Sequence, residues 1–139
     1  MKKIIDKITY PPFIWEVIIP TLFKIAIIIF IIIPIITNMA SPLRKSPEKV
    51  EKDILKITPI GMDMEDVINV LNNKKGWQID FISYDHGYIE RLNSLSTKTV
   101  NADLGKYSNL LYETYVEAFW GFDDNFKLIE VYVRKDGGL

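Results

Sequence analysis

Residues 17–36 read VIIPTLFKIAIIIFIIIPII, a run in which Lys24 is the single charged side chain. An α-helix rises about 1.5 Å per residue, so about twenty apolar residues cover the ~30 Å hydrocarbon layer of a bilayer. The stretch predicts a transmembrane helix which, with an N-terminal tail, occupies residues 1–40. Pro20 and Pro34 each remove one backbone hydrogen bond, so we expect the helix to bend at both without ending.

The main competing interpretation of this stretch is a cleaved signal peptide, whose apolar core is ~7–15 residues long and is followed by small side chains. Residues 25–36 have that length and Ala40 is small, but Asn38 occupies a position that a cleavage site reserves for a small residue. We therefore favour a retained span. Lys24 is expected to extend its ammonium group toward the headgroups. Contact with the span of a partner protein is the alternative.

Charge is distributed unevenly along the chain. Residues 1–52 contain eight Lys/Arg and four Asp/Glu, whereas residues 53–139 contain nine and fourteen. The positive excess lies beside the span, where anionic headgroups attract it. The negative excess of the remainder argues against nucleic acid as a partner.

Basic residues flank both ends of the span, so the positive-inside rule does not separate the two orientations. A short tail ahead of a C-terminal domain is the usual layout of a signal anchor. On that analogy we expect a single-pass protein of a bacterial plasma membrane, with its domain outside the cytoplasm. Abundant Ile, Lys and Asn are the reason for expecting a bacterial source.

Residues 41–46 predict a short linker, and residues 47–139 predict one small domain that begins with two helices. The first helix starts at Ser46-Pro47 and ends at Thr58-Pro59, because the residue before a proline avoids helical geometry. For the second, the Asp63 carboxylate is expected to accept from the N–H of Glu65 or Asp66. Gly76 is expected to end this helix in a left-handed conformation. The predicted buried positions are Val50, Ile54 and Ile57 in the first helix, and Met64, Val67, Ile68 and Leu71 in the second.

After Gly76 the apolar residues alternate with polar ones, which is typical of strands. We expect strands at 77–82 and 97–104, a loop at 105–109, and a hairpin of 112–122 and 127–134 around a turn at 123–125. Residues 88–92 predict a further short strand. Across the hairpin one face should pair Val116, Ala118 and Trp120 with Ile129, Val131 and Val133. Helices followed by strands imply an α+β fold, with two short helices packed on one face of an antiparallel sheet.

The opposite face of this hairpin is the candidate partner-binding surface. Tyr115 and Phe119 alternate with Val116 and Trp120, and Tyr132 alternates with Val131, so these aromatic rings should share a face with Glu117. An exposed face that combines aromatic and acidic side chains suits contact with another protein. The alternative is a solvated face that the domain's own loops cover.

Catalytic and metal-binding signals are weak. His86 is the only histidine and Asp85 precedes it, but a hydrolase also needs a nucleophile held against the imidazole, and no glycine-flanked nucleophile is present. A polar turn residue is the favoured interpretation; a small membrane-bound hydrolase and a pH-sensing imidazole are the alternatives. Residues 123–125 offer oxygens to calcium but lack the glycine and distal glutamate of an EF-hand, so a turn is favoured. Because the chain has no cysteine, disulfides and thiolate chemistry are excluded, and we expect no cofactor or metal.

Two segments carry a resemblance. Residues 59–67, PIGMDMEDV, open a helix ahead of the strands, and this arrangement resembles the repeat unit of SmpA/OmlA-like and β-lactamase-inhibitory-protein-like domains. Residues 119–129, FWGFDDNFKLI, resemble the closing hairpin of uncharacterised small bacterial membrane-anchored proteins. The chain departs from the lipoprotein members by lacking an acylated cysteine, and Phe126 stands where a turn glycine is common. The resemblance implies a domain that binds a protein or peptide without catalysis; an immunity-type inhibitor is one version of this role.

Overall fold

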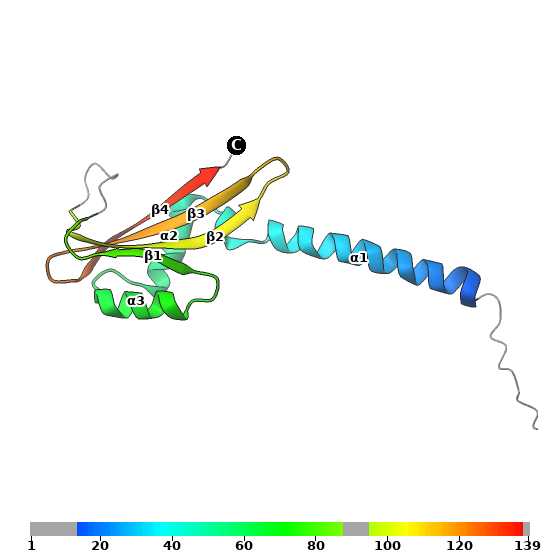
Figure 1. Ribbon diagram of the computed structural model, residues 1–139, viewed down its shortest axis with the longest axis horizontal. Coiled ribbons are helices and arrows are strands. Elements are labelled where there is room, and N and C mark those ends of the chain that lie inside the picture. The colour runs from blue at the N-terminus through cyan, green and yellow to red at the C-terminus, as the bar shows by residue number, and fades with distance from the viewer. Residues whose placement is uncertain (1–13, 88–94, 138–139) are drawn as a thin grey trace, which may run out of the picture. The chain divides into compact units, whose positions relative to one another are not determined.

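The computed structural model describes residues 14–87 and 95–137. The chain divides into two compact units, one ending at Met39 and one beginning at Ala40. The first is a helix, and the second has the α+β fold expected from the sequence (Figure 1).

The first unit consists of a short π-helix, Ile14–Ile18, followed by the α-helix α1, Ile19–Met39. The segment from Glu16 to Thr37 is long and apolar enough to cross a bilayer, and its side chains are exposed. This confirms the predicted apolar helix, whose length and composition also suit a signal sequence.

Neither proline ends the helix, as expected. The wide π-helical turn lies directly before Pro20, where a regular helix would lack one N–H bond and would bring the ring against a carbonyl. Pro34 lies inside α1, and the Thr37 hydroxyl bonds to the carbonyl oxygens of Ile33 and Pro34, at 3.1 Å each. That hydroxyl adds hydrogen bonding in the turn next to the proline.

The second unit begins with the predicted helix pair. These are α2, Pro47–Ile57, and α3, Met64–Asn73. Gly76 is left-handed with a φ of 86°, as expected, but it does not end the helix, because the C-cap is Lys74. The prediction that Asp63 caps α3 through its side chain is wrong, because its carboxylate instead forms an ion pair with the Lys127 ammonium at 2.8 Å.

Four antiparallel strands form the sheet in the order β1-β2-β3-β4. They are β1, Gln78–Ser83; β2, Lys98–Ser108; β3, Glu113–Phe122; and β4, Leu128–Gly137. The loop expected at 105–109 is wrong over residues 105–108. β2 continues through a bulge, where Gly105 adopts a φ of 106° and donates its N–H to the Asp103 carboxylate at 2.7 Å. The short strand expected at 88–92 lies outside the described residues.

The core lies between the helices and one face of the sheet. The β3–β4 register confirms that Ala118 and Trp120 share a face with Val131 and Val133: Ala118 lies opposite Val133, and Trp120 lies opposite Val131. Val116 lies opposite Lys135. The expected partnership of Ile129 is wrong, because a bulge between Gly121 and Phe122 places Leu128 opposite Phe122. The buried side chains of this core are Val50, Ile54, Met64, Val67, Leu71, Val100, Ala102, Leu104, Val116, Ala118, Trp120, Phe122, Leu128, Val131 and Val133.

Residues 42–45, expected within the linker, are fastened to the second unit. Leu43 packs against the core. The Arg44 guanidinium lies 5.1 Å from the ring centroid of Tyr107 and donates to Asn109 Oδ1 at 3.0 Å. The Lys135 ammonium donates to the carbonyl oxygens of Leu43 and Lys45. The chain is therefore held to the domain within a few residues of the end of α1.

The β3–β4 turn contains a bulky residue in a left-handed conformation: Phe126 has a φ of 62°. A turn glycine is common at this position of such hairpins, and Phe126 stands in its place. The Lys98 ammonium lies 4.5 Å from the centroid of the Phe126 ring, a cation–π contact that offsets part of the backbone strain.

Substitutions at Phe126 should therefore be ranked by backbone preference. Asparagine tolerates this conformation and should leave stability close to that of the parent. Valine, which is β-branched, should be about 1–2 kcal/mol less stable than asparagine. Urea unfolding of the two variants measures the difference, and equal stabilities would show that the turn relaxes to another conformation.

Candidate functional site

The face of the sheet turned away from α2 and α3 is the candidate binding surface, and we call it the open face (Figure 1). The strand register places Phe81 of β1, Asn101 of β2, Phe119 of β3 and Tyr132 of β4 in one row across it. This confirms that Phe119 and Tyr132 share a face opposite to Trp120 and Val131.

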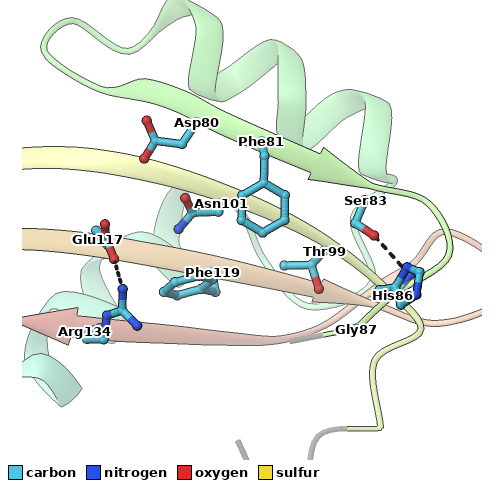
Figure 2. A pocket seen from close by; sticks show the side chains of 10 residues that line it. All are labelled: Asp80, Phe81, Ser83, His86, Gly87, Thr99, Asn101, Glu117, Phe119 and Arg134. Atoms are coloured by element: carbon cyan, nitrogen blue, oxygen red, sulfur yellow. Dashed lines mark hydrogen bonds and ion pairs between the residues drawn. The ribbon is translucent and has the colours of Figure 1, made fainter. Parts of the chain in front are cut away.

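A hollow of about 650 Å³ lies on the open face. Thr99, Asn101 and Phe119 line it from β2 and β3, while Phe81 and His86 line it from β1 and the following turn (Figure 2). The hollow thus combines aromatic rings with hydroxyl and amide groups, a mixture that ligand sites commonly contain.

The inner polar groups of the hollow are incompletely hydrogen-bonded. Thr99 is 1% exposed, and its hydroxyl oxygen has no hydrogen-bond partner among the described residues. Asn101 is also buried, and its amide group makes a long bond of 3.4 Å to the carbonyl oxygen of Ala118. Leaving a buried polar group unpaired costs about 1–3 kcal/mol. The oxygen is itself buried, and a hydrogen bond from a ligand that reaches it would recover that cost.

The structure brings two of the four predicted site residues, Glu117 and Phe119, into the hollow. Glu117 forms an ion pair with Arg134 at 2.6 Å, and the Arg134 guanidinium lies 5.5 Å from the centroid of the Phe119 ring. Phe119 is consequently only 6% exposed. Tyr132 lies beside it, with ring centroids 6.4 Å apart.

Tyr115 lies on the open face outside the hollow. Its half-exposed ring contacts the Lys106 ammonium at 5.6 Å, and its hydroxyl donates to the Glu113 carboxylate at 3.2 Å. The hydrogen bond from Lys106, followed by that from Tyr115, lowers the pKa of Glu113. Tyr115 therefore contributes an exposed aromatic ring beside an ion pair.

Several residues of the hollow were not predicted from the sequence: Phe81, Thr99, Asn101 and Arg134. Thr99 and Asn101 alternate with the core residues Val100 and Ala102 in a predicted strand, so the sequence was sufficient to place them on the open face. The sequence could not predict that they lie beside Phe81, because this depends on the β1–β2 register and on a bulge between Ile79 and Phe81.

His86 stands in a local turn that does not form a Ser–His–Asp triad. Its Nδ1 lies 2.7 Å from the Asp85 carboxylate, and this hydrogen bond lowers the pKa of Asp85. The Ser83 hydroxyl donates to the same carboxylate at 3.2 Å and accepts from the His86 backbone N–H at 3.0 Å. In this arrangement the serine proton points to the acid, whereas general-base activation needs it to point to the imidazole.

The turn at 123–125 is held by backbone hydrogen bonds. The Asp123 carboxylate accepts from the N–H groups of Asn125 and Lys127, at 2.9 Å each. Within residues 14–87 and 95–137, no group of three or more His, Asp or Glu side chains is placed to hold a metal ion. These contacts favour the turn interpretation over a calcium site.

Ser96 lies against the open face at one end of the hollow. A Cβ atom built on Gly121 would lie 2.7 Å from the Ser96 Cβ and 2.8 Å from the Glu130 Cγ. One built on Gly87 would lie 1.8 Å from the Ser96 carbonyl oxygen. Glycine is therefore required at both positions for this close approach.

Comparison of the chain with protein-family models, with curated proteins and with solved structures finds no match.

Proposed function

We propose that this chain is a membrane-anchored, non-catalytic module of the bacterial cell envelope that binds a protein or peptide through the open face. The observation that carries the proposal is the hollow, which is lined by the aromatic rings of Phe81 and Phe119 and by Thr99, whose buried hydroxyl has no hydrogen-bond partner among the described residues. The resemblance to SmpA/OmlA-like and β-lactamase-inhibitory-protein-like domains points to the same class of function.

A peptide segment matches the chemistry of the hollow. Its backbone amides both donate and accept hydrogen bonds, as do the Thr99 hydroxyl and the Asn101 amide. Its apolar side chains would pack on Phe81, which is half-exposed. The Glu117–Arg134 ion pair adds charges of both signs at the rim, which favour one register of the bound segment.

Membrane anchoring is supported by the length and hydropathy of α1. We propose one pass through the plasma membrane with the domain outside the cytoplasm, following the usual layout of a signal anchor. Resistance of the full chain to carbonate extraction tests the anchor, and protease treatment of intact cells tests the orientation. Release by carbonate, or a mature N-terminus close to Ser41, would contradict a retained span.

The hydrolase alternative has less support. It requires the His86 imidazole to accept a proton from a nucleophile, but the Ser83 hydroxyl donates to Asp85. An immunity-type inhibitor, in contrast, is a protein-binding role and agrees with the proposal. The identity of the captured partner would separate it from other binding roles.

The double variant Phe81→Ala/Tyr115→Ala should lose at least about tenfold in partner capture, because truncating buried aromatic contacts typically costs more than 1 kcal/mol each. Both rings are half-exposed in the free chain, so its thermal unfolding should stay near that of the parent. In-cell crosslinking of the tagged full-length chain measures capture. Phe119 is left intact because alanine at this buried position would open a cavity.

Ile60→Ala provides the control, since Ile60 is an exposed apolar residue in the turn before α3 and is not among the residues that line the hollow. It should capture partners as the parent does. Full capture by the Phe81/Tyr115 variant would contradict binding through the open face.

A further inference from the structure

We propose that the tip of the β2–β3 hairpin, residues 109–112, inserts into the membrane interface close to the point where α1 leaves the bilayer. The ligand of this second surface is the lipid headgroup layer and the adjoining acyl chains. The inference rests on the proposed membrane anchoring and adds a second contact with the bilayer, made by the folded domain.

The first observation is the exposure of the tip. Leu110 is 100% exposed and Leu111 is 88% exposed, and Tyr112 follows them, partly exposed. Two adjacent leucines that touch almost nothing are unfavourable in water, whereas leucine and tyrosine together suit a boundary between an apolar and a polar phase. Their side chains support no described core contact, so a packing role does not account for them.

The second observation is the covalent path from α1 to this tip. α1 ends at Met39, and Arg44 is fastened to the hairpin through Asn109 Oδ1 and the Ser108 carbonyl oxygen. Five residues of extended chain reach at most about 18 Å. The headgroup layer on one side of a bilayer is itself about 5–8 Å thick. If α1 spans the membrane, the chain therefore holds the hairpin tip close to the lipid surface.

The third observation is the charge around the base of the hairpin. The Arg44 guanidinium and the Lys135 ammonium each lie 5.1 Å from the ring centroid of Tyr107. Arg44 precedes α2 and Lys135 is in β4, so residues distant in sequence meet at this end of the domain. Lys45 is adjacent: its carbonyl oxygen accepts from the Lys135 ammonium, and its own ammonium forms an ion pair with Asp53. Cations behind an apolar tip are the pattern of a peripheral contact with anionic lipid.

Insertion would also orient the candidate site. β3 begins at Glu113, next to the tip, and Phe119 lies six residues further along the strand. At about 3.3 Å per residue, the hollow would stand about 20 Å from the strand end that touches lipid. The open face would then project from the membrane, where a partner can reach it.

The absence of cysteine makes the test specific, because one introduced cysteine is the only labelling site. The full-length Leu110→Cys chain would carry an environment-sensitive NBD fluorophore in vesicles of equal parts phosphatidylcholine and phosphatidylglycerol. We expect lipids with a quencher on the acyl chain to reduce its emission at least about threefold more than that of a water-exposed probe, since interfacial side chains sit ~5–10 Å deep.

Asp124→Cys is the matched control, because its exposed turn lies at the other end of β3. Strong quenching at position 110 and weak quenching at 124 supports insertion of the tip. Weak quenching at both positions, or strong quenching at both, would overturn it. Adding Leu111→Asp to the labelled Leu110→Cys chain should lower its quenching to the level of the control without unfolding the domain.

Carbonate extraction of the same vesicles separates the two proposals. If the chain resists carbonate extraction but the probe at position 110 is not quenched, only the proposal that the hairpin tip inserts is contradicted. A chain that carbonate releases contradicts the anchor and therefore both proposals.

Discussion

Replacing Trp120 with alanine should lower the free energy of unfolding by about 3–5 kcal/mol, the range measured for large aromatic side chains in cores. Trp120 is fully buried near the end of β3, in the core between the sheet and the two helices. A domain of this size has a total stability of roughly 5–15 kcal/mol. The variant should therefore unfold at a much lower urea concentration than the parent, as followed by circular dichroism of the full chain in detergent.

The hydrogen bond of the indole group has its own smaller contribution. The Trp120 Nε1–H donates to the Thr58 hydroxyl at 3.0 Å, and that hydroxyl donates to the Ile54 carbonyl oxygen at 3.1 Å. Thr58→Val would leave a buried indole N–H unpaired, at a cost of about 1–3 kcal/mol.

Trp77→Ala is the control for Trp120→Ala, because Trp77 contacts the Trp120 ring at 6.1 Å but is only partly buried. It should cost less than the Trp120 substitution. An equal or greater loss for Trp77 would contradict the assignment of Trp120 to the centre of the core.

The elements that the sequence predicted correctly are those set by local spacing. Val50 and Ile54 lie four residues apart and face the core in α2, and Gly76 adopts the left-handed conformation expected after α3. Ala118 and Trp120 likewise alternate along β3 and share the expected face with Val131 and Val133 of β4. Periods of 3.6 and 2 are properties of the backbone, so these assignments need no tertiary information.

The features that the sequence did not predict depend on contacts between distant residues. Arg44 and Lys135 lie 91 positions apart, yet together they fasten residues 42–45 to the domain. Asp63 meets Lys127 because the β3–β4 turn returns beside α3, and this ion pair replaces the expected helix cap. The bulge at Gly105 requires a positive φ. Glycine adopts positive and negative φ values about equally readily, so its presence alone does not predict a bulge.

The candidate site divides in the same way. Strand alternation placed Phe119, Glu117, Tyr115 and Tyr132 on one face, but it did not show that Arg134 covers Phe119 or that Tyr115 lies outside the hollow. Whether the Thr99 hydroxyl has a hydrogen-bond partner depends on how β1, β2, β3 and the turn after β1 pack around it. This was therefore visible only in the folded chain.

Gly121→Ala should destabilise the domain by about 1–3 kcal/mol, the usual cost of adding atoms to a tightly packed site. The new methyl group would lie 2.7 Å from the Ser96 Cβ and 2.8 Å from the Glu130 Cγ, both well below a normal contact distance. Glu130 has a flexible side chain and can shift, but the Ser96 Cβ is attached directly to the backbone. Relief of the overlap therefore requires the chain at Ser96 to move away from the open face.

That displacement should be detectable next to Ser96. The Thr97 N–H donates to the Phe122 carbonyl oxygen at 2.8 Å, so hydrogen exchange at Thr97 should accelerate in the Gly121→Ala variant. Gly137→Ala is the control, because its added Cβ would lie at an ordinary 3.7 Å from the Tyr112 ring and should be close to neutral. If Gly121→Ala were as stable as the control and left Thr97 protected, Ser96 would not lie against β3.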